Sequence, residues 1–333
     1  MIKWGILGCG GIANTFARAV NEAVPSGSLV AAAARSGERA LAFAKSHGIE
    51  KHYGSYEELV ADPHVDAIYV ATPHSHHREH AMLALSHGKH VLCEKALAIN
   101  SREVAEMFSL ANEKKLFLME AMWMRFLPSM RYLCDFLEKG ELGRIKSVSV
   151  DFSFEGNKDP ERRLLNPELA GGALLDVGIY PLNFAMMVLG EDPERVVGDA
   201  YIGPTQVDES NSFTLTYGGG VQASCTSSVV KLGSKAAHIE LENGVIDIPE
   251  FWRAQKLMVT KDGGKTVDEL DMPFDSNGFE YEVRSAIEAI ECGKLENDIM
   301  PADLSKKVMK IMDQLREQWE LVYPMERSLE KSS

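Results

Sequence analysis

A carboxylate and a phenol lie four residues apart in an otherwise apolar run, residues 171–180. The run is predicted to be helical, and at this spacing Asp176 and Tyr180 share one helix face. An aspartate among leucine, valine and isoleucine is costly to bury unless a polar group meets it. With a cation from elsewhere in the chain, the pair would form a proton-transfer station. The alternative is structural: Asp176 offsets the dipole at a helix N-terminus and Tyr180 fills a gap in the core.

A glycine-rich turn follows the first apolar run of the chain. Residues 2–7 are predicted to form a strand, residues 12–23 a helix, and Gly8, Gly10 and Gly11 lie between them. The first glycine allows a tight turn, and the second lets the backbone approach a pyrophosphate at the helix N-terminus. This context favours a dinucleotide site that includes Ile12 over a purely structural glycine turn.

The end of the second predicted strand, 29–34, indicates which dinucleotide is bound. No acid stands there, although an NAD site expects one for the ribose 2′-hydroxyl. Arg35, Ser36 and Arg39 follow instead, and two guanidinium groups with a hydroxyl suit a 2′-phosphate. The sequence therefore predicts NADP in preference to NAD. Glu38 weakens this prediction, and the arginines have a structural alternative as a strand end and a solvated helix face.

Histidines cluster after the predicted strand 66–71, at the sheet edge where open α/β folds bind ligands. Six of them lie between residues 74 and 90. His76 and His80 are one helical turn apart, but no nearby acid-and-cysteine set completes a metal shell, so no metal site is predicted. The residues of this segment that we expect near the cofactor are Thr72, Pro73, His74 and His77.

Lys95 follows the next predicted strand, 90–93, and should point into the same crevice. A cation there favours the phenolate form of a nearby tyrosine, and it can also relay a proton itself. Glu94, beside it, is placed near the cofactor as well. A surface lysine paired with Glu94 is the structural alternative.

Composition excludes several functional classes. A chain of 333 residues is expected to form two domains. Its net charge of −14 argues against nucleic acid and anionic membrane surfaces as partners. Five cysteines without regular spacing are typical of buried thiols in a reducing cytosol. The first strand leaves no room for a signal peptide, and no uninterrupted apolar run of 18 residues appears, so we expect a cytoplasmic protein.

The hydrophobic pattern divides the chain into domains at 1–121 and 122–333. In the first, apolar runs alternate with helical stretches, which predicts a doubly wound parallel sheet. In the second, polar and apolar residues alternate, which predicts an α/β domain with a large, mostly antiparallel sheet and one open face. Such a face is a candidate homodimer interface. The predicted strands are 2–7, 29–34, 66–71, 90–93, 116–119, 145–154, 196–202, 211–217, 220–229, 236–241 and 245–249.

Together these features resemble the glucose–fructose oxidoreductase/inositol dehydrogenase (Gfo/Idh/MocA) family over nearly the whole chain. Residues 54–59, 91–95, 116–126 and 171–180 carry the resemblance. The chain is most similar to the dimeric dihydrodiol dehydrogenase branch, whose members also act as NADP-dependent D-xylose dehydrogenases. The resemblance implies a Rossmann domain, a second domain whose open sheet forms a dimer, and hydride transfer between NADP and a sugar-like or cyclic diol hydroxyl.

The resemblance also implies roles for single residues. Lys95 and Tyr180 carry proton transfer with support from Asp176, and Arg125 lies by the cofactor with Trp123. Tyr180 stands where the wider family has histidine, as it does in the dihydrodiol branch. The residues implied to contact the substrate are Trp123, Phe154, Asp176, Tyr180, Trp252 and Phe279.

Ala96 departs from the family pattern, because most relatives have a proline after the lysine, and that proline typically follows a cis peptide. A cis bond before a residue other than proline costs about 2.5–4 kcal/mol, against about 0.5–1 kcal/mol before proline. We therefore predict that the Lys95–Ala96 peptide is trans.

Other functions compete with this interpretation. Within the same class, the chain would be a keto-sugar reductase or an inositol or glucose dehydrogenase. From another class, it would be a non-catalytic, NADP-sensing regulatory protein, which has no need of Lys95 and Tyr180. A metal-dependent hydrolase built on the histidine cluster is a further alternative.

Overall fold

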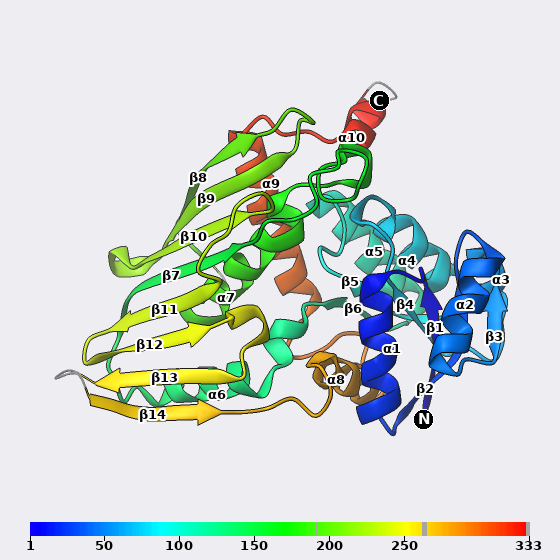
Figure 1. The fold of residues 1–333 in the computed structure, drawn as a ribbon, viewed down its shortest axis with the longest axis horizontal. Coiled ribbons are helices and arrows are strands. Elements are labelled where there is room, and N and C mark those ends of the chain that lie inside the picture. The colour runs from blue at the N-terminus through cyan, green and yellow to red at the C-terminus, as the bar shows by residue number, and fades with distance from the viewer. Residues whose placement is uncertain (191, 262–264, 331–333) are drawn as a thin grey trace. The chain divides into compact units, whose positions relative to one another are not determined.

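A computed structural model describes residues 1–190, 192–261 and 265–330 of the chain. They form two compact units, each with one sheet (Figure 1). The first unit contains Met1–Phe126 and Phe274–Lys306, and the second contains Leu127–Pro273 and the chain from Lys307 onward.

The first unit is built on a six-stranded parallel sheet in the order β3-β2-β1-β4-β5-β6, which confirms the predicted doubly wound sheet. Its central strands are apolar runs without alternation, because helices cover both faces of such a sheet. Only β3, a three-residue edge strand, was not predicted. The strands are β1 (Ile2–Leu7), β2 (Gly27–Ala33), β3 (Lys51–Tyr53), β4 (Ala67–Val70), β5 (His90–Glu94) and β6 (Leu118–Ala121). The helices between them are α1 (Gly11–Ala23), α2 (Gly37–His47), α3 (Tyr56–Ala61), α4 (His77–Ser86) and α5 (Ser101–Lys114).

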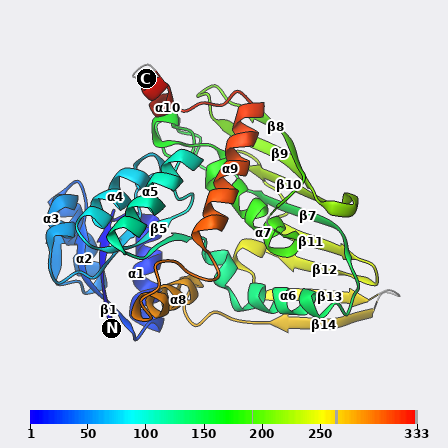
Figure 2. The ribbon, with the colours of Figure 1, turned by 180° about the vertical axis from the view of Figure 1, so that it is seen from behind.

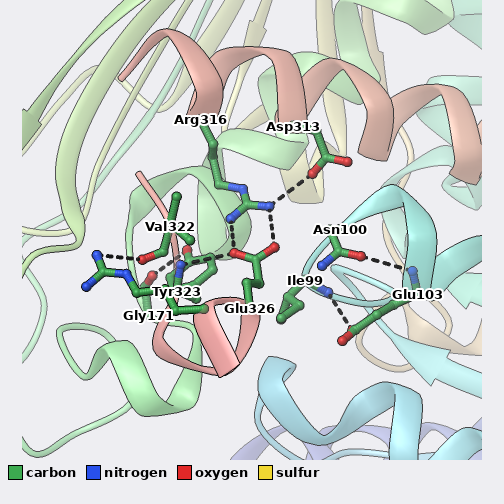
Figure 3. Close-up of polar contacts among 10 residues, drawn as sticks. Ile99, Asn100, Glu103, Gly171, Asp313, Arg316, Val322, Tyr323 and Glu326 are labelled. Carbon is green, nitrogen blue, oxygen red and sulfur yellow. Dashed lines mark hydrogen bonds and ion pairs between the residues drawn. The ribbon is translucent and has the colours of Figure 1, made fainter. Parts of the chain in front are cut away.

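Side-chain caps fix where several of these helices begin. At α5, the Asn100 side chain accepts a hydrogen bond from the Glu103 amide at 3.0 Å, and the Glu103 carboxylate accepts one from the Ile99 amide at 3.4 Å (Figure 3). This reciprocal pattern satisfies amides that have no partner within the helix. Ser36 caps α2 in the same manner, accepting from the Arg39 amide at 3.5 Å.

A segment that follows the second sheet in sequence returns to the first unit. Its helix α8 (Phe279–Glu291) packs against α1, and Arg284 Nε donates to the Ala23 carbonyl, 3.0 Å away and 261 positions earlier. That carbonyl ends α1 and has no partner inside its own helix. The predicted division at 1–121 and 122–333 therefore differs from the structure, because no local pattern reveals a contact at this separation.

The second unit contains an eight-stranded sheet in the order β14-β13-β12-β11-β7-β10-β9-β8. Neighbouring strands are antiparallel except β7 and β10, so the predicted mostly antiparallel sheet is confirmed. The edge strand β14 and its neighbour β13 were not predicted. The strands are β7 (Ile145–Ser153), β8 (Arg195–Ile202), β9 (Asp208–Thr216), β10 (Gln222–Ser228), β11 (Ala236–Leu241), β12 (Gly244–Pro249), β13 (Lys256–Lys261) and β14 (Lys265–Asp271).

Helices pack on one face of this sheet, as the two opposite views show (Figures 1 and 2). Alternation along each strand directs apolar side chains such as Val148 and Val150 to this buried face. On the other face, Val197 and Tyr201 remain 42% and 58% exposed. The helices of this unit are α6 (Pro128–Lys139), α7 (Ile179–Leu189), α9 (Ala302–Gln318, which begins in the first unit) and α10 (Pro324–Glu330).

The stretch Pro167–Leu189 is long and apolar enough to cross a membrane by length and composition alone. However, 83% of its most apolar window is buried inside the chain. It contains a π-helical turn, Leu174–Gly178, that runs directly into α7. The stretch is therefore the core helix of the second unit.

Two C-terminal helices hold the start of this core helix. The Tyr323 hydroxyl donates to the Gly171 carbonyl at 2.8 Å (Figure 3). Arg316 of α9 is 5% exposed and donates to both carboxylate oxygens of Glu326 in α10, at 2.8 and 3.1 Å, and to Asp313 at 3.0 Å. A buried ion pair therefore docks α10 beside the segment that leads into the core helix.

The peptide between Lys95 and Ala96 is cis, so the prediction of a trans bond is wrong. That prediction weighed only the local free energy of the bond. In the structure, the Ala96 carbonyl lies 2.8 Å from His77 Nδ1, and the Leu97 amide donates to Glu120 at 2.9 Å. Both contacts come from other elements, and the local sequence does not reveal them.

Replacing Glu326 with alanine should leave the Arg316 guanidinium buried with less compensation. Removing one partner of a buried ion pair costs about 3 kcal/mol of unfolding free energy. Equilibrium urea unfolding of the full chain would measure the loss, with Arg327→Ala as an exposed control expected to change stability by about 0.5 kcal/mol or less. Equal stability of the two variants would contradict a structural role for the pair.

Candidate active site

The glycine-rich turn between β1 and α1 has the shape that a phosphate needs. Gly8 has a φ of 102°, and a Cβ there would lie 3.0 Å from the Ala71 carbonyl oxygen, so only glycine fits without strain. A Cβ on Gly10 or Gly11 would meet nothing within 4 Å. The first turn of α1, which includes Ile12, carries no acidic side chain. The open space and the helix N-terminus together fit a pyrophosphate.

Two exposed arginines lie beside this turn. Arg39, in the first turn of α2, is close enough to Cys9 to oppose the effect of burial, which raises the pKa of that thiol to about 11. Arg35 and Arg39 both act on Tyr56 as well, where burial raises the pKa and the two positive charges lower it. The structure thus brings both predicted cations to one side of the turn, together with the α2 cap at Ser36.

The histidines after β4 are largely occupied with this chain's own backbone. His77 is 1% exposed, and its ring nitrogens lie 2.7 Å from the Thr72 carbonyl and 2.8 Å from the Ala96 carbonyl. Burial lowers the pKa of His77 to about 4, the Lys95 charge acts in the same direction, and the two carbonyl oxygens oppose both. His80 Nδ1 lies 3.0 Å from the Thr72 hydroxyl, and His74 is buried at the turn after Pro73.

Among the residues that the structure describes, no group of three or more His, Cys, Asp or Glu side chains is arranged to hold a metal ion. His76 and His80 stack with their ring centroids 5.6 Å apart. The His76 Nδ1 atom faces the Ser75 hydroxyl at 2.8 Å.

Lys95 lies at the carboxyl end of β5 among buried acids. Its amide donates to Glu94 Oε2 at 3.3 Å, and the other Glu94 oxygen accepts a hydrogen bond from Tyr69. Glu120 in β6 is 1% exposed. Burial raises the pKa of Glu120 to about 7, while the Leu97 amide and the Lys95 charge lower it. The sequence analysis gave Glu120 no role, because a carboxylate inside a short apolar strand has no motif of its own.

Two more predicted residues lie together in the first unit. The Trp123 ring stacks on Phe279 of α8, with centroids 4.8 Å apart and an interplanar angle of 29°. Trp123 and Arg125 belong to one buried 3₁₀ turn, Trp123–Phe126, directly after β6. Trp123 and Phe279 are 156 positions apart in the sequence, so only the family resemblance had indicated both.

The second unit holds the carboxylate and the phenol. Asp176 lies in the π-helical turn and Tyr180 in the first turn of α7, where they are 4% and 6% exposed. Arg163 donates to both Asp176 oxygens, at 2.5 and 3.5 Å. The expected cation beside the carboxylate is therefore Arg163, which comes from a loop and which no sequence spacing links to Asp176.

Tyr180 belongs to an aromatic cluster within the second unit. Phe152 of β7 is its centre: its ring stacks on Trp252 at 4.3 Å, and it meets the Tyr180 ring edge-on at 5.2 Å. Phe154, two residues along the strand, lies 6.4 Å from Phe152. Phe152 was missed by the sequence analysis, although its alternation with Phe154 on one strand face was visible.

A buried aspartate supports the turn that carries Asp176. Asp208 Oδ2 accepts hydrogen bonds from the Leu174 amide at 2.7 Å and from Asn211 at 2.8 Å. A Cβ on Gly172 would lie 2.2 Å from Asp208 Oδ1, so the backbone at Gly172 must pass close to this carboxyl. π-helical turns occur frequently at functional sites, and this one is held at its first amide.

Comparison with known proteins gives one family model for each of two parts of the chain. Residues 2–122 match a family model described as oxidoreductase family, NAD-binding Rossmann fold, and residues 130–247 match a model of the Gfo/Idh/MocA C-terminal domain. The trans-1,2-dihydrobenzene-1,2-diol dehydrogenase of Xenopus tropicalis is 37% identical over 97% of this chain and 99% of its own. The human enzyme of the same name is 35% identical over 98% and 99%.

Solved structures show the same fold. A 3-ketoreductase from Actinomadura kijaniata, in complex with NADP and TDP-benzene, has a TM-score of 0.87 and 26% identity over 96% of this chain and 98% of its own. An aldose-aldose oxidoreductase from Caulobacter crescentus, complexed with glycerol, has a TM-score of 0.86 and 25% identity over 96% and 97%. The chain therefore belongs to the Gfo/Idh/MocA family of NAD(P)-binding oxidoreductases that act on hydroxyl groups.

Proposed function

We propose that this protein is an NADP-dependent dehydrogenase of a cyclic diol or a sugar-like substrate. The observation that carries the proposal is the aromatic cluster in which Tyr180, Trp252 and Phe154 all lie against Phe152. Asp176 lies in the π-helical turn that runs into the helix of Tyr180. A phenol and a carboxylate supply proton-transfer and hydrogen-bonding groups, while the aromatic rings suit the apolar face of a ring-shaped substrate.

Preference for NADP is supported by the two exposed arginines beside the glycine-rich turn. An NAD site would place an acid at the end of β2, where this chain has Ala34 and then Arg35. Guanidinium groups form charge-assisted hydrogen bonds to phosphate oxygens, and α2 begins at the same place, so its N-terminal dipole adds to the attraction. The ketoreductase of similar fold also binds NADP.

A bound nicotinamide would accept or supply the hydride. Tyr180 would exchange the proton of the substrate hydroxyl, and Asp176, held by Arg163, would orient a second hydroxyl. Lys95 is the other candidate for the proton-transfer group, since it lies on the edge of the first sheet that also carries the cofactor turn.

The relatives favour different substrates. The dihydrodiol dehydrogenases, at 35–37% identity, favour a cyclic diol. The ketoreductase and the aldose-aldose oxidoreductase, at 25–26%, favour a keto-sugar or an aldose. We place a cyclic diol and an aldose first. The sequence identity to the dihydrodiol dehydrogenases is higher than to the other two enzymes, and the aromatic cluster suits both kinds of substrate. A non-catalytic NADP sensor remains the alternative from another class.

We also propose a cytoplasmic homodimer that pairs through the open face of the second unit's sheet. Five free cysteines fit a reducing compartment. Val197 and Tyr201 are four residues apart in β8, so both side chains lie on that face. They expose apolar surface that a second copy would cover.

Replacing both Arg35 and Arg39 with alanine should raise the KM for NADP⁺ by about 10–100-fold or more, because each lost charged hydrogen bond is worth about 1.5–3 kcal/mol. The KM for NAD⁺ should change little. Initial rates from nicotinamide absorbance measure both, with the exposed Arg18→Ala variant as the control. If NADP⁺ and NAD⁺ were affected equally, the arginines would not recognise the 2′-phosphate.

Tyr180→Phe should lower kcat by about 10²–10⁴-fold with a D-xylose or dihydrodiol substrate, because the proton-transfer group is lost. NADPH binding, measured by protein fluorescence, should stay unchanged. Tyr132→Phe in α6 is the control that loses a hydroxyl elsewhere. Near-normal turnover in Tyr180→Phe together with loss in Lys95→Met would make Lys95 the proton-transfer group. Binding of NADPH without turnover of any substrate in either direction would favour the sensor.

Light scattering of the purified protein should give the mass of a dimer. The double variant Val197→Glu, Tyr201→Glu should be a folded monomer, because it places like charges on a face that meets its own copy. A wild-type monomer, or a double variant that stays dimeric, would rule out this face as the interface.

A further inference from the structure

The peptide that joins Ala96 to Leu97 is held on both sides by buried ionisable side chains. Its carbonyl oxygen faces His77 Nδ1 at 2.8 Å, and its N–H donates to Glu120 Oε1 at 2.9 Å. Ala96 and Leu97 have no exposed surface, and His77 and Glu120 have 1% each. Water therefore does not compete for either hydrogen bond.

The two side chains come from different elements of the first unit. His77 begins α4 and also contacts the Thr72 carbonyl at 2.7 Å, so it ties the loop after β4 to the loop after β5. Glu120 lies in β6, opposite Cys93 in the sheet ladder. Neither could follow a shift of the Lys95 segment without breaking contacts in its own element.

We propose that His77 and Glu120 are positioning residues for Lys95, because together they fix the Ala96–Leu97 peptide that directly follows the Lys95–Ala96 bond. The inference rests on the proposed function, which makes Lys95 part of the reaction. We call His77 and Glu120 together the clamp. The proposal gives a role to these two side chains, which no step of that reaction uses directly.

Glu120 is the acid of this pair, and its charge determines how strongly it accepts from the Leu97 amide. Burial raises the pKa of Glu120 to about 7, so this acid changes charge in the physiological range. The Leu97 amide and the Lys95 charge lower that pKa, whereas the Glu94 charge raises it. Ser305 of α9 also faces Glu120, but its hydroxyl has no hydrogen-bond partner among the described residues, so its effect on the Glu120 pKa is small. The groups that face Glu120 are Cys93, Glu94, Lys95, Leu97 and Ser305.

The sign of the effect follows from these groups. Below about pH 7 the Glu120 carboxyl is neutral, and above it the carboxylate adds a negative charge near the Lys95 ammonium. The hydrogen bond from the Leu97 amide then becomes charge-assisted, so the peptide is held more firmly. Activity that depends on the placement of Lys95 should therefore rise with pH through this range.

Glu120→Gln separates charge from shape, because its amide oxygen can still accept from the Leu97 amide. The readout is acetylation of the Lys95 amine, followed by peptide mass spectrometry on the protein without cofactor at pH 8. Without the charge-assisted hydrogen bond the Lys95 segment is held less firmly, so labelling of Lys95 should be about threefold to tenfold faster. Exposed Lys115 serves as the internal reference. Glu282→Gln is the matched control, since it removes another fully buried carboxyl of the first unit, whose pKa burial also raises.

Kinetic measurements test how the clamp affects turnover. Glu120→Ala and His77→Ala should lower kcat by about 10–100-fold with little change in NADPH affinity, and Glu120→Gln should restore most of kcat while losing the rise of kcat/KM near pH 7. Unchanged Lys95 labelling in Glu120→Gln would overturn the charge role. Full activity in both alanine variants would overturn the positioning role.

The labelling result also keeps the two proposals apart. If no substrate is turned over, the proposed function fails, yet Lys95 labelling still reports whether Glu120 acts on Lys95. If an alanine variant does not fold, Glu120→Gln and a His77→Asn variant retain a hydrogen-bonding group, and their thermal stability and labelling decide the question.

Discussion

Every strand of a parallel sheet ends at the same edge, and the chain leaves that edge with backbone groups that the sheet ladder no longer pairs. Burying such a group without a partner costs about 1–3 kcal/mol. This protein pairs them with ionisable side chains: His77 meets two carbonyls, Glu94 accepts from the Lys95 amide, and Glu120 accepts from the Leu97 amide. A structural requirement thereby places titratable groups around Lys95, the lysine of this edge that we propose takes part in the reaction.

The second unit meets the same constraint with different residues. The turn that carries Asp176 begins at the Leu174 amide, which the buried Asp208 accepts, and the Tyr323 hydroxyl donates to the Gly171 carbonyl just before it. Burial raises the pKa of Asp208 to about 7, although the hydrogen bonds from Asn211 and Leu174 lower it. In both units, then, a buried acid holds the backbone within two residues of a proposed functional side chain, and function and packing are not separable there.

Local patterns sufficed for most of the fold, because apolar runs, glycine turns and caps are properties of neighbouring residues. The parallel sheet, the antiparallel sheet and the glycine-rich turn were predicted in this way. Contacts between distant residues were not: the return of Phe274–Lys306 to the first unit depends on Arg284 and α1, and the cis bond at Ala96 is accompanied by contacts from His77 and Glu120. The same limit hid Arg163 as the partner of Asp176, since only folding brings the loop and the helix together.

The distribution of charge bears on the substrate. A chain with a net charge of −14 repels anions at long range, although salt screens this beyond about 8 Å. Anion binding must therefore come from local cations. Arg35 and Arg39 lie at the cofactor turn, and Arg163 is already paired with Asp176. The aromatic cluster around Phe152 consists of neutral side chains. A neutral diol or aldose can bind there without a further cation, whereas a nucleotide-linked sugar of the kind suggested by the ketoreductase would bring two phosphates to an acidic protein. Charge alone thus favours the neutral substrates.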